Sequence, residues 1–232
     1  MKYKYIFLDL DDTIWDFEVN AKSSLEDLYK VKNLSRYFDD FEHFFDIYIN
    51  NNALLWKQYG EKKITKDYLV LNRFSYPFTK VGAPQSDDFV LQMGCEYLDI
   101  LSTKTVLVPY AQELLGYLSE KYPLTVVSNG FIEVQYKKMR SSDIEHYFSH
   151  IVFSEHVKAP KPDKRIFEHA LSLNEAKAEQ VVMIGDNFDA DIRGAQNAGI
   201  STIYFNPKGK SIPEGQAPDS EVKSLSEVKN IL

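Results

Sequence analysis

The sequence predicts an α/β protein in which a doubly wound parallel sheet is interrupted by an all-helical insertion. From residue 105 onward, short apolar runs alternate with helical patterns, which is the rhythm of a parallel sheet with crossover helices. A similar apolar run at residues 3–8 stands alone, far ahead of the others. Between residues 16 and 103, apolar side chains recur at helical spacing with hardly a strand-like run among them.

Composition and charge narrow the class of protein. The chain has 232 residues and a net charge of −7, which argues against an extended surface for nucleic acids. Two basic clusters, at residues 61–63 and 136–140, are interpreted as solvated faces. Cys95 is the only cysteine, which excludes an internal disulfide and a cysteine zinc cluster. Because no run approaches membrane-spanning length and no signal-peptide pattern is present, we expect a cytoplasmic protein that binds no membrane.

The run at residues 3–8 is the first expected element. It is short, aromatic and β-branched, and such a run is typical of a strand buried on both faces. Helical periodicity then predicts four helices, with Thr65 as the N-cap of the third and a loop bounded by Pro77 and Pro84 before the fourth. These helices are expected near residues 20–30, 36–59, 65–76 and 85–101.

The rest of the chain predicts alternating helices and strands. Pro109 opens a helix that runs to residue 121. The expected strands then cover residues 123–128, 151–153, 181–184 and 200–205, and the expected helices cover residues 131–140, 162–173 and 190–198. A loop rich in proline and glycine precedes a last short strand and a helix at residues 224–232.

The helical block interrupts the sheet after its first strand. We therefore expect two domains, an α/β core made of residues 1–15 and 104–232 and a helical domain made of residues 16–103. A long insertion at the carboxyl edge of the first strand is placed to act as a cap over a site at that edge.

Asp9, Asp11 and Thr13 follow the first strand directly. Ligands of parallel sheets bind outside the carboxyl ends of the strands, so these residues stand where chemistry is expected. Residues two apart on an extended strand point to the same side, and the two carboxylates would repel each other without a cation between them. Hard oxygen ligands favour Mg²⁺. The alternative is a simple turn, because Asp and Thr are common where a chain leaves a strand.

Ser128, Asn129 and Gly130 follow the second core strand and open a helix. The first N–H groups of a helix are unpaired, so a hydroxyl, an amide and a glycine at this position supply donors to an anion. The alternative is a plain N-cap. Lys161 and Pro162 precede another helix, with Pro162 suited to its first turn. A lysine there can reach the acidic residues as a positive point charge, and the alternative is a solvated lysine.

Asp186 and Asp191 lie after the strand at residues 181–184. Asp186 would add a hard oxygen ligand to the site at the first strand, and Asp191 would orient Lys161 or a metal-bound water. A calcium-loop interpretation fails because no Glu follows at the required distance.

His146 and His150 stand four residues apart, which is a spacing that zinc ligands on one helix face share. No Glu follows His146 as the helix of a metalloprotease requires, and Tyr147 and Phe148 are typical of a packed helix end. We therefore do not expect zinc there.

The four motifs, taken together and in this order, resemble those of the haloacid dehalogenase-like hydrolase superfamily. They are Asp9-x-Asp11-x-Thr13, Ser128-Asn129-Gly130, Lys161-Pro162 and Gly185-Asp186 to Asp191. The resemblance covers the whole core and implies a Rossmann-like fold, and the helical insertion is similar to the helical cap subclass. Residues 53–59 with Ile64 and Thr65, and Ser128-Asn129-Gly130-Phe131, further resemble the pyrimidine 5′-nucleotidase branch.

The resemblance implies a phosphomonoesterase with a covalent intermediate. Asp9 would attack phosphorus and form an aspartyl-phosphate, from which water then releases phosphate. Asp11 would protonate the leaving oxygen and then accept a proton from the attacking water. The implied ligands of Mg²⁺ are Asp9, Asp186 and the Asp11 carbonyl. The implied phosphate-binding groups are Ser128, the Asn129 backbone and Lys161, with Thr13 fixing the first loop.

The resemblance also implies a small phosphomonoester substrate, with a preference for deoxypyrimidine monophosphates. Trp56, Tyr59 and Arg73 are candidates for contacts with the base. No nucleic acid polymer is expected as a partner, and the oligomeric state is not predicted. A phosphatase of sugar or other small phosphates, a phosphomutase and a catalytically silent binding module remain alternatives. A dehalogenase is disfavoured, because it needs no second acid such as Asp11.

One departure from the family pattern lies before the lysine-proline pair, where similar proteins usually carry a glycine. This chain has Lys158-Ala159-Pro160 instead, so two lysines compete for the phosphate-binding role. Lys161 is favoured because Pro162 and the helix after it match in register.

Overall fold

The computed structural model describes residues 3–232 of the chain, which divide into two compact units. One unit contains the residues up to Phe17 together with Thr105–Leu232. The other unit consists of Glu18–Lys104. We refer to them as the α/β unit and the helical unit.

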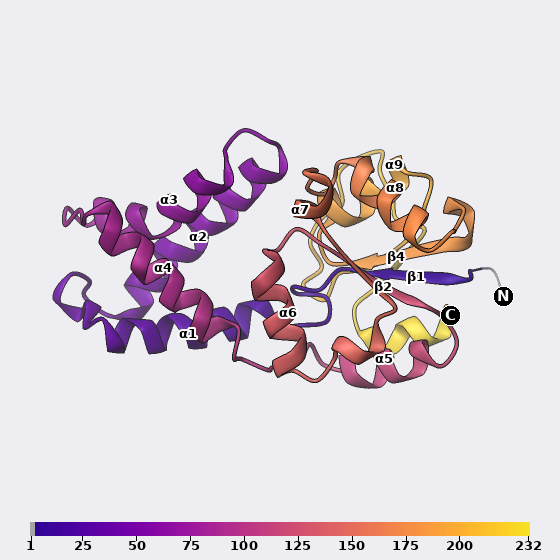
Figure 1. Ribbon diagram of the computed structural model, residues 1–232, viewed down its shortest axis with the longest axis horizontal. Helices are drawn as coiled ribbons and strands as arrows, with labels where there is room; N and C mark the ends of the chain where they lie inside the picture. The colour runs from indigo at the N-terminus through magenta and orange to yellow at the C-terminus, as the bar shows by residue number, and fades with distance from the viewer. Residues whose placement is uncertain (1–2) are drawn as a thin grey trace. The chain divides into compact units, whose positions relative to one another are not determined.

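A parallel six-stranded sheet forms the centre of the α/β unit (Figure 1). Its order is β3-β2-β1-β4-β5-β6, and every neighbouring pair is parallel. The strands are β1 (Tyr5–Leu8), β2 (Leu124–Ser128), β3 (His150–Phe153), β4 (Val181–Gly185), β5 (Ser201–Phe205) and β6 (Ser220–Val222). The winding direction reverses between β1 and β4, and ligands of doubly wound sheets bind at such a switch point. The predicted α/β fold class is confirmed.

Helices cover both faces of this sheet (Figure 1). On one face lie α8 (Lys164–Leu173) and α9 (Gly194–Asn197), and on the other lie α5 (Ala111–Ser119) and the 3₁₀ helix η5 (Leu225–Asn230). Phe7, Val127 and Met183 of the three central strands pack with Ile166 and Phe167 of α8 in one fully buried cluster. Because the strands are covered on both faces, their residues form continuous apolar runs. The remaining elements are α6 (Ile132–Ser141), η2 (Glu145–Tyr147), α7 (Ser154–Val157), η3 (Ala178–Gln180) and the π-helical turn η4 (Phe188–Arg193).

The helical unit is built from α1 (Phe17–Val31), the 3₁₀ turn η1 (Leu34–Arg36), α2 (Phe41–Gly60), α3 (Lys66–Lys80) and α4 (Asp87–Leu101). Its core is aromatic. Tyr48 of α2 lies 4.9 Å from Phe74 of α3 and 5.8 Å from Tyr97 of α4, measured between ring centroids. Thr65 accepts a hydrogen bond from the Tyr68 N–H at 3.2 Å, so the predicted N-cap of α3 is confirmed.

Several predicted element bounds are wrong. Pro77 does not end α3, which continues to Lys80, because one further turn buries Phe78 completely. Residues 36–40 precede α2 rather than belonging to it, since Asp40 caps that helix by accepting from the His43 N–H. The helix expected at residues 190–198 is instead a π-helical turn followed by a short α-helix, and the helix expected at residues 224–232 is a 3₁₀ helix.

The predicted helix start at Pro162 is also wrong. Asp163 is the N-cap of α8, and its carboxylate accepts from the Arg165 N–H at 3.0 Å. Pro162 therefore precedes the cap instead of standing in the first turn. This correction leaves Lys161 in the loop just before α8, within reach of the sheet edge.

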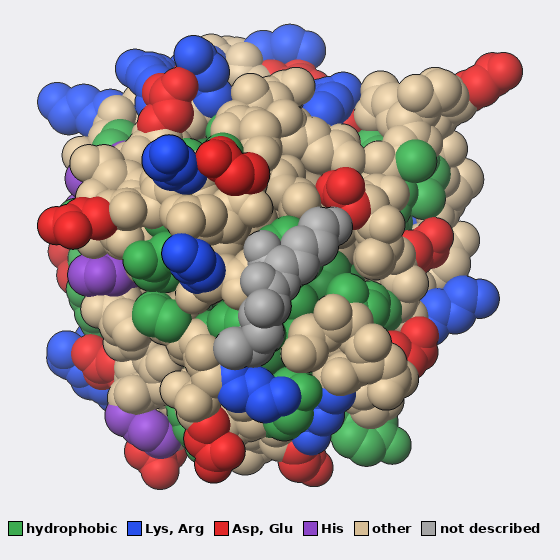
Figure 2. Space-filling view, turned by 90° about the vertical axis from the view of Figure 1, so that its right-hand side faces the viewer, with side chains coloured by type: hydrophobic (Ala, Val, Ile, Leu, Met, Phe, Trp, Pro, Cys, Tyr) green, Lys and Arg blue, Asp and Glu red, His purple; other side chains and the backbone are tan. Residues whose placement is uncertain are grey.

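The view in Figure 2 shows basic and acidic side chains interspersed over one face of the molecule, without a continuous patch of either sign. Among residues 3–232, no helix combines the length and apolarity that crossing a membrane requires.

Candidate active site

A buried ion cluster forms where β1 and β4 end. The Lys161 Nζ lies 2.6 Å from Asp9 Oδ1 and 2.7 Å from Asp191 Oδ1, and it also donates to the Val127 carbonyl at 2.7 Å. The exposed fractions of Lys161 and Asp191 are 3% and 1%. A charge this well covered is stable only when it is paired and hydrogen-bonded, and Lys161 meets both conditions.

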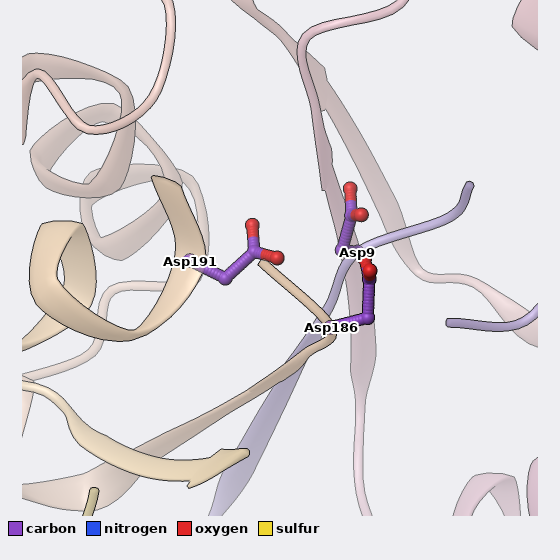
Figure 3. Close-up of side chains that lie close together, drawn as sticks. All are labelled: Asp9, Asp186 and Asp191. Carbon is purple, nitrogen blue, oxygen red and sulfur yellow. The ribbon is translucent and has the colours of Figure 1, made fainter. Parts of the chain in front are cut away.

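Asp186 completes a group of three carboxylates (Figure 3). Asp9 follows β1, Asp186 follows β4 and Asp191 lies on η4, and the three side chains face a common space. One carboxylate oxygen from each of the three lies within 4.8 Å of the others. Three residues that are far apart in the sequence therefore meet at the switch point of the sheet.

Local backbone contacts hold these carboxylates in place. The Asp9 N–H donates to the Ile184 carbonyl at 3.0 Å, which continues the β1–β4 ladder to the carboxyl edge of the sheet. Asp191 accepts from the Asn187 N–H at 3.0 Å. A Cβ atom on Gly185 would lie 2.4 Å from Asp191 Oδ2. Only glycine therefore fits at the end of β4, because the Asp191 side chain passes directly over that backbone.

Burial and mutual repulsion shift the titration of the cluster. Burial raises the pKa of Asp9 well above its ordinary value, Lys161 opposes that change, and Asp191 and Asp186 add to it. Burial also raises the pKa of Asp186 to about 7, with further contributions from Asp191 and Asp12. Burial alone would lower the pKa of Lys161, but Asp191 and Asp9 together raise it above the ordinary value of a lysine.

These features fit a divalent cation with hard oxygen ligands. The site brings three carboxylates together around one buried ammonium, that of Lys161. Burial and the neighbouring carboxylates raise the pKa of Asp9 and of Asp186, and a cation bound there would offset both effects. The described residues supply no histidine or cysteine to this group. Carboxylate oxygens of this kind suit Mg²⁺ rather than a softer metal.

The segment after β2 presents the Ser128 hydroxyl and orders the loop that carries Lys161. Ser128 Oγ accepts from Gly130 N–H at 3.1 Å and from Gln135 Nε2 at 2.8 Å. Because both acceptor positions of that hydroxyl are used, its own hydrogen is free to point toward an anion. The Asn129 side chain accepts from the Lys161 N–H at 2.7 Å and donates to the Lys161 carbonyl at 3.0 Å. This pair of bonds fixes the backbone from which Lys161 extends.

Asp11 and Thr13 lie beyond the end of β1, and each binds a partner from another segment of the chain. The strand β1 ends at Leu8, and Asp12 adopts a left-handed conformation with φ 58°, so the chain turns. The Asp11 carboxylate accepts from Lys138 Nζ at 2.7 Å and from Gln135 Nε2 at 2.8 Å. Thr13 is fully buried and accepts the Asp186 N–H at 3.1 Å.

Sequence reasoning missed Gln135 and Lys138. The basic cluster at residues 136–140 was interpreted as a solvated face, which holds for Lys137 and Arg140 but is wrong for Lys138, whose exposed fraction is 3%. The available signal was their spacing, since residues three apart on α6 share one face. Lys210 was missed as well, and its Nζ lies 3.4 Å from Asp186 Oδ2 at a half-exposed position.

Other sequence candidates lie elsewhere. Lys158 is exposed at the end of α7, so only Lys161 of the two competing lysines reaches the cluster. His146 lies in η2 and His150 in β3, so they do not share a helix face. In the helical unit, Arg73 is buried with its guanidinium over the rings of Phe74 and Tyr97. The rings of Trp56 and Tyr59 pack edge to face on α2.

The fold and this carboxylate–lysine site define a hydrolase of the α/β class with a helical insertion. The sequence-family model of the haloacid dehalogenase-like hydrolases matches residues 3–199 of the chain. The chain belongs to this family, and the resemblance inferred from the four motifs is confirmed.

Three similar proteins extend the comparison. The chain is 33% identical to the pyrimidine 5′-nucleotidase PynA of Streptococcus pneumoniae, over 100% of this chain and 98% of that protein. It is 27% identical to the pyrimidine 5′-nucleotidase YjjG of Escherichia coli, over 100% of this chain and 99% of that protein. The crystal structure of the HAD-family protein YfnB of Bacillus subtilis, bound to magnesium, matches with a TM-score of 0.90 at 30% identity and covers 100% of this chain and 99% of that one. The narrower likeness to pyrimidine 5′-nucleotidases is thereby confirmed as a likeness.

Proposed function

We propose that this protein is a Mg²⁺-dependent phosphomonoesterase that acts through an aspartyl-phosphate and prefers pyrimidine nucleoside monophosphates. The observation that supports this most is the position of Lys161, which links Asp9 to Asp191 at the end of the central strand. A lysine held there would neutralise charge beside a carboxylate nucleophile, and charge stabilisation of this kind supplies much of the catalysis of phosphoryl transfer.

In this proposal Asp9 is the nucleophile. Its Oδ1 is engaged by Lys161, so the other oxygen would attack phosphorus while the lysine holds the carboxylate and a phosphoryl oxygen. The Ser128 hydroxyl and the Asn129 backbone N–H would donate to further phosphoryl oxygens. Asp11 would give a proton to the leaving oxygen and then remove one from the attacking water, so that it ends each cycle in its starting state.

Asp9, Asp186 and the backbone carbonyl of Asp11 would hold the cation. When bound, Mg²⁺ would supply positive charge that offsets both the clustered carboxylates and the phosphoryl oxygens. Thr13 would keep Asp186 in position, since its hydroxyl accepts the Asp186 N–H. Asp191 would act through Lys161, whose ammonium it holds against Asp9.

The substrate part of the proposal is supported by the two pyrimidine 5′-nucleotidases that align with the whole chain. Glyceraldehyde 3-phosphate phosphatases also align, at 27% identity over 88% of the chain. We place the nucleotide substrates first because PynA is more similar, at 33% identity, and both nucleotidases match the full length of the chain. The helical unit would act as the cap, as we expected for residues 16–103 from the sequence. We also propose a cytoplasmic location.

A substrate panel tests this proposal. We expect Mg²⁺-dependent release of phosphate from dUMP and dTMP to exceed release from hexose phosphates, glyceraldehyde 3-phosphate and purine nucleotides. Faster turnover of a sugar or triose phosphate would overturn the nucleotide part and leave the phosphatase part intact. Interconversion of phosphate isomers without net release would indicate a phosphomutase. No release from any ester with Mg²⁺ present would favour a silent binding module.

A further inference from the structure

The Asp11 carboxylate is held from both sides by two residues of α6. Lys138 Nζ lies 2.7 Å from Asp11 Oδ1, and Gln135 Nε2 lies 2.8 Å from Asp11 Oδ2. Gln135 and Lys138 are almost completely covered, with exposed fractions of 1% and 3%. Burying a lysine and a glutamine is costly unless both are paired. Their hydrogen bonds to the Asp11 carboxylate are therefore needed to keep the two side chains buried.

Lys138 also anchors the loop that carries Asp11. Its ammonium lies 4.3 Å from the ring centroid of Trp15 and 5.4 Å from that of Phe17. Trp15 is fully buried and stands four residues after Asp11. The cation–π contact therefore fixes the lysine on the same loop whose carboxylate it binds, so the loop is held through a ring and a carboxylate at once.

Gln135 connects Asp11 to the phosphate-binding segment. The same Nε2 that donates to Asp11 also donates to Ser128 Oγ at 2.8 Å. A Cβ atom on Gly130 would lie 2.4 Å from the Gln135 side chain. Glycine at this position therefore leaves the space through which the glutamine reaches both partners.

We propose that Gln135 and Lys138 are positioning residues that orient the Asp11 carboxylate for proton transfer and align it with the phosphate-binding Ser128. This inference rests on the proposed function, in which Asp11 is the general acid and base. The two donors leave the remaining lone pairs of Asp11 directed away from α6. Without them the carboxylate is free to rotate, and its proton is no longer held in one orientation toward the leaving oxygen.

Leaving-group dependence separates this role from a merely structural one. A nucleoside leaves as an alkoxide and needs a proton, whereas p-nitrophenolate leaves without one. The value of kcat/KM includes the steps up to departure of the leaving group, so it reports this difference directly. The experiment compares kcat/KM for dUMP, or for the best alkyl phosphate of the substrate panel, with kcat/KM for p-nitrophenyl phosphate.

For Lys138→Met we expect kcat/KM for the alkyl phosphate to fall about 10- to 100-fold more than kcat/KM for p-nitrophenyl phosphate. Methionine keeps the apolar contact with Trp15, and Lys138→Arg is expected to restore most of the loss because it keeps a donor. Lys137→Met is the matched control, because this exposed lysine is the preceding residue on the same helix, and it should change neither value. Gln135→Leu removes the donor to the other oxygen and also the donor to Ser128. It should therefore lower kcat/KM for both substrates and lower that of the alkyl phosphate more, which provides a second variant if Lys138→Met does not fold.

Equal losses for both substrates, or no loss for either, would overturn the positioning role. Asp11→Asn distinguishes this failure from failure of the proposed function. If Asp11→Asn is selective and the Lys138 and Gln135 variants are not, then Asp11 is the acid and these two residues do not position it. If Asp11→Asn itself lacks selectivity, the proposed role of Asp11 is wrong and this inference fails with it.

Discussion

The Lys161 ammonium lies 2.6 Å from Asp9 Oδ1, although the two residues are separated by 152 positions in the chain. The contact joins the end of the first strand to the loop before α8. Because Asp191 binds the same ammonium at 2.7 Å, the lysine neutralises two buried carboxylates rather than one. Catalysis and stability are therefore expected to depend on the same three side chains.

Replacing Lys161 should both destabilise the protein and abolish activity. In Lys161→Met, Asp9 and Asp191 lose their shared cation, and breaking a buried pair in this way costs about 3–5 kcal/mol. Adding Asp191→Asn to that variant removes one of the stranded charges, so the double variant should recover part of the free energy of unfolding without recovering activity. Lys158→Met, at the exposed neighbouring lysine, is the control and should change neither property. Full activity in Lys161→Met would contradict the assignment.

Binding of Mg²⁺ should strengthen as the pH rises. The pKa of Asp186 is raised to about 7, so below that pH the carboxyl carries a proton that the cation must displace. The apparent Kd for Mg²⁺, measured by calorimetry, should therefore fall about tenfold per pH unit between pH 5.5 and 7 and level off above. Removing the cation with a chelator should abolish phosphate release, and adding Mg²⁺ should restore it. In Asp186→Asn the contribution of that carboxyl is lost and the pH dependence should be weaker, with the raised pKa of Asp9 supplying what remains. An affinity that does not vary with pH in the wild-type protein would show that Asp186 is not a ligand.

Thr13 should matter through one hydrogen bond. Its hydroxyl accepts the Asp186 N–H at 3.1 Å in a fully buried position. Thr13→Val keeps the shape but leaves that N–H without an acceptor, which should cost about 1–3 kcal/mol of unfolding free energy and weaken Mg²⁺ binding. Thr13→Ser retains the hydroxyl and should behave like the wild type in both measurements. If the valine variant binds Mg²⁺ as tightly as the serine variant does, the hydroxyl does not position Asp186.

Much of the fold was readable from the sequence because its signals are local. The apolar run before Asp9 and the run at residues 181–184 are strands that helices cover on both faces, and the composition of such strands makes them recognisable. Since carboxyl ends of neighbouring parallel strands meet at one edge, the approach of Asp186 to Asp9 followed from the order of elements alone.

The contacts that sequence reasoning missed depend on tertiary structure. Lys138 stands in a run of basic residues that looks solvated, and only the packing of α6 against the first loop buries it. Sequence reasoning gave the Asp11 carboxylate no partner on α6, whereas it accepts there from Lys138 Nζ. Pro77 looked like a helix end, yet the burial of Phe78 outweighs the hydrogen bond that proline removes. In each case a long-range contact overrides a local propensity.

The most direct test of the central claim, that Asp9 forms a covalent phosphoryl intermediate, is acid quenching during turnover followed by peptide mass spectrometry. With Mg²⁺ and dUMP present, we expect one phosphoryl group on the peptide that contains Asp9, and no label in Asp9→Asn, whose phosphate release should fall by at least about 10³-fold. Phosphate release by Asp9→Asn at the wild-type rate, or a phosphoryl group on a different residue, would contradict the claim.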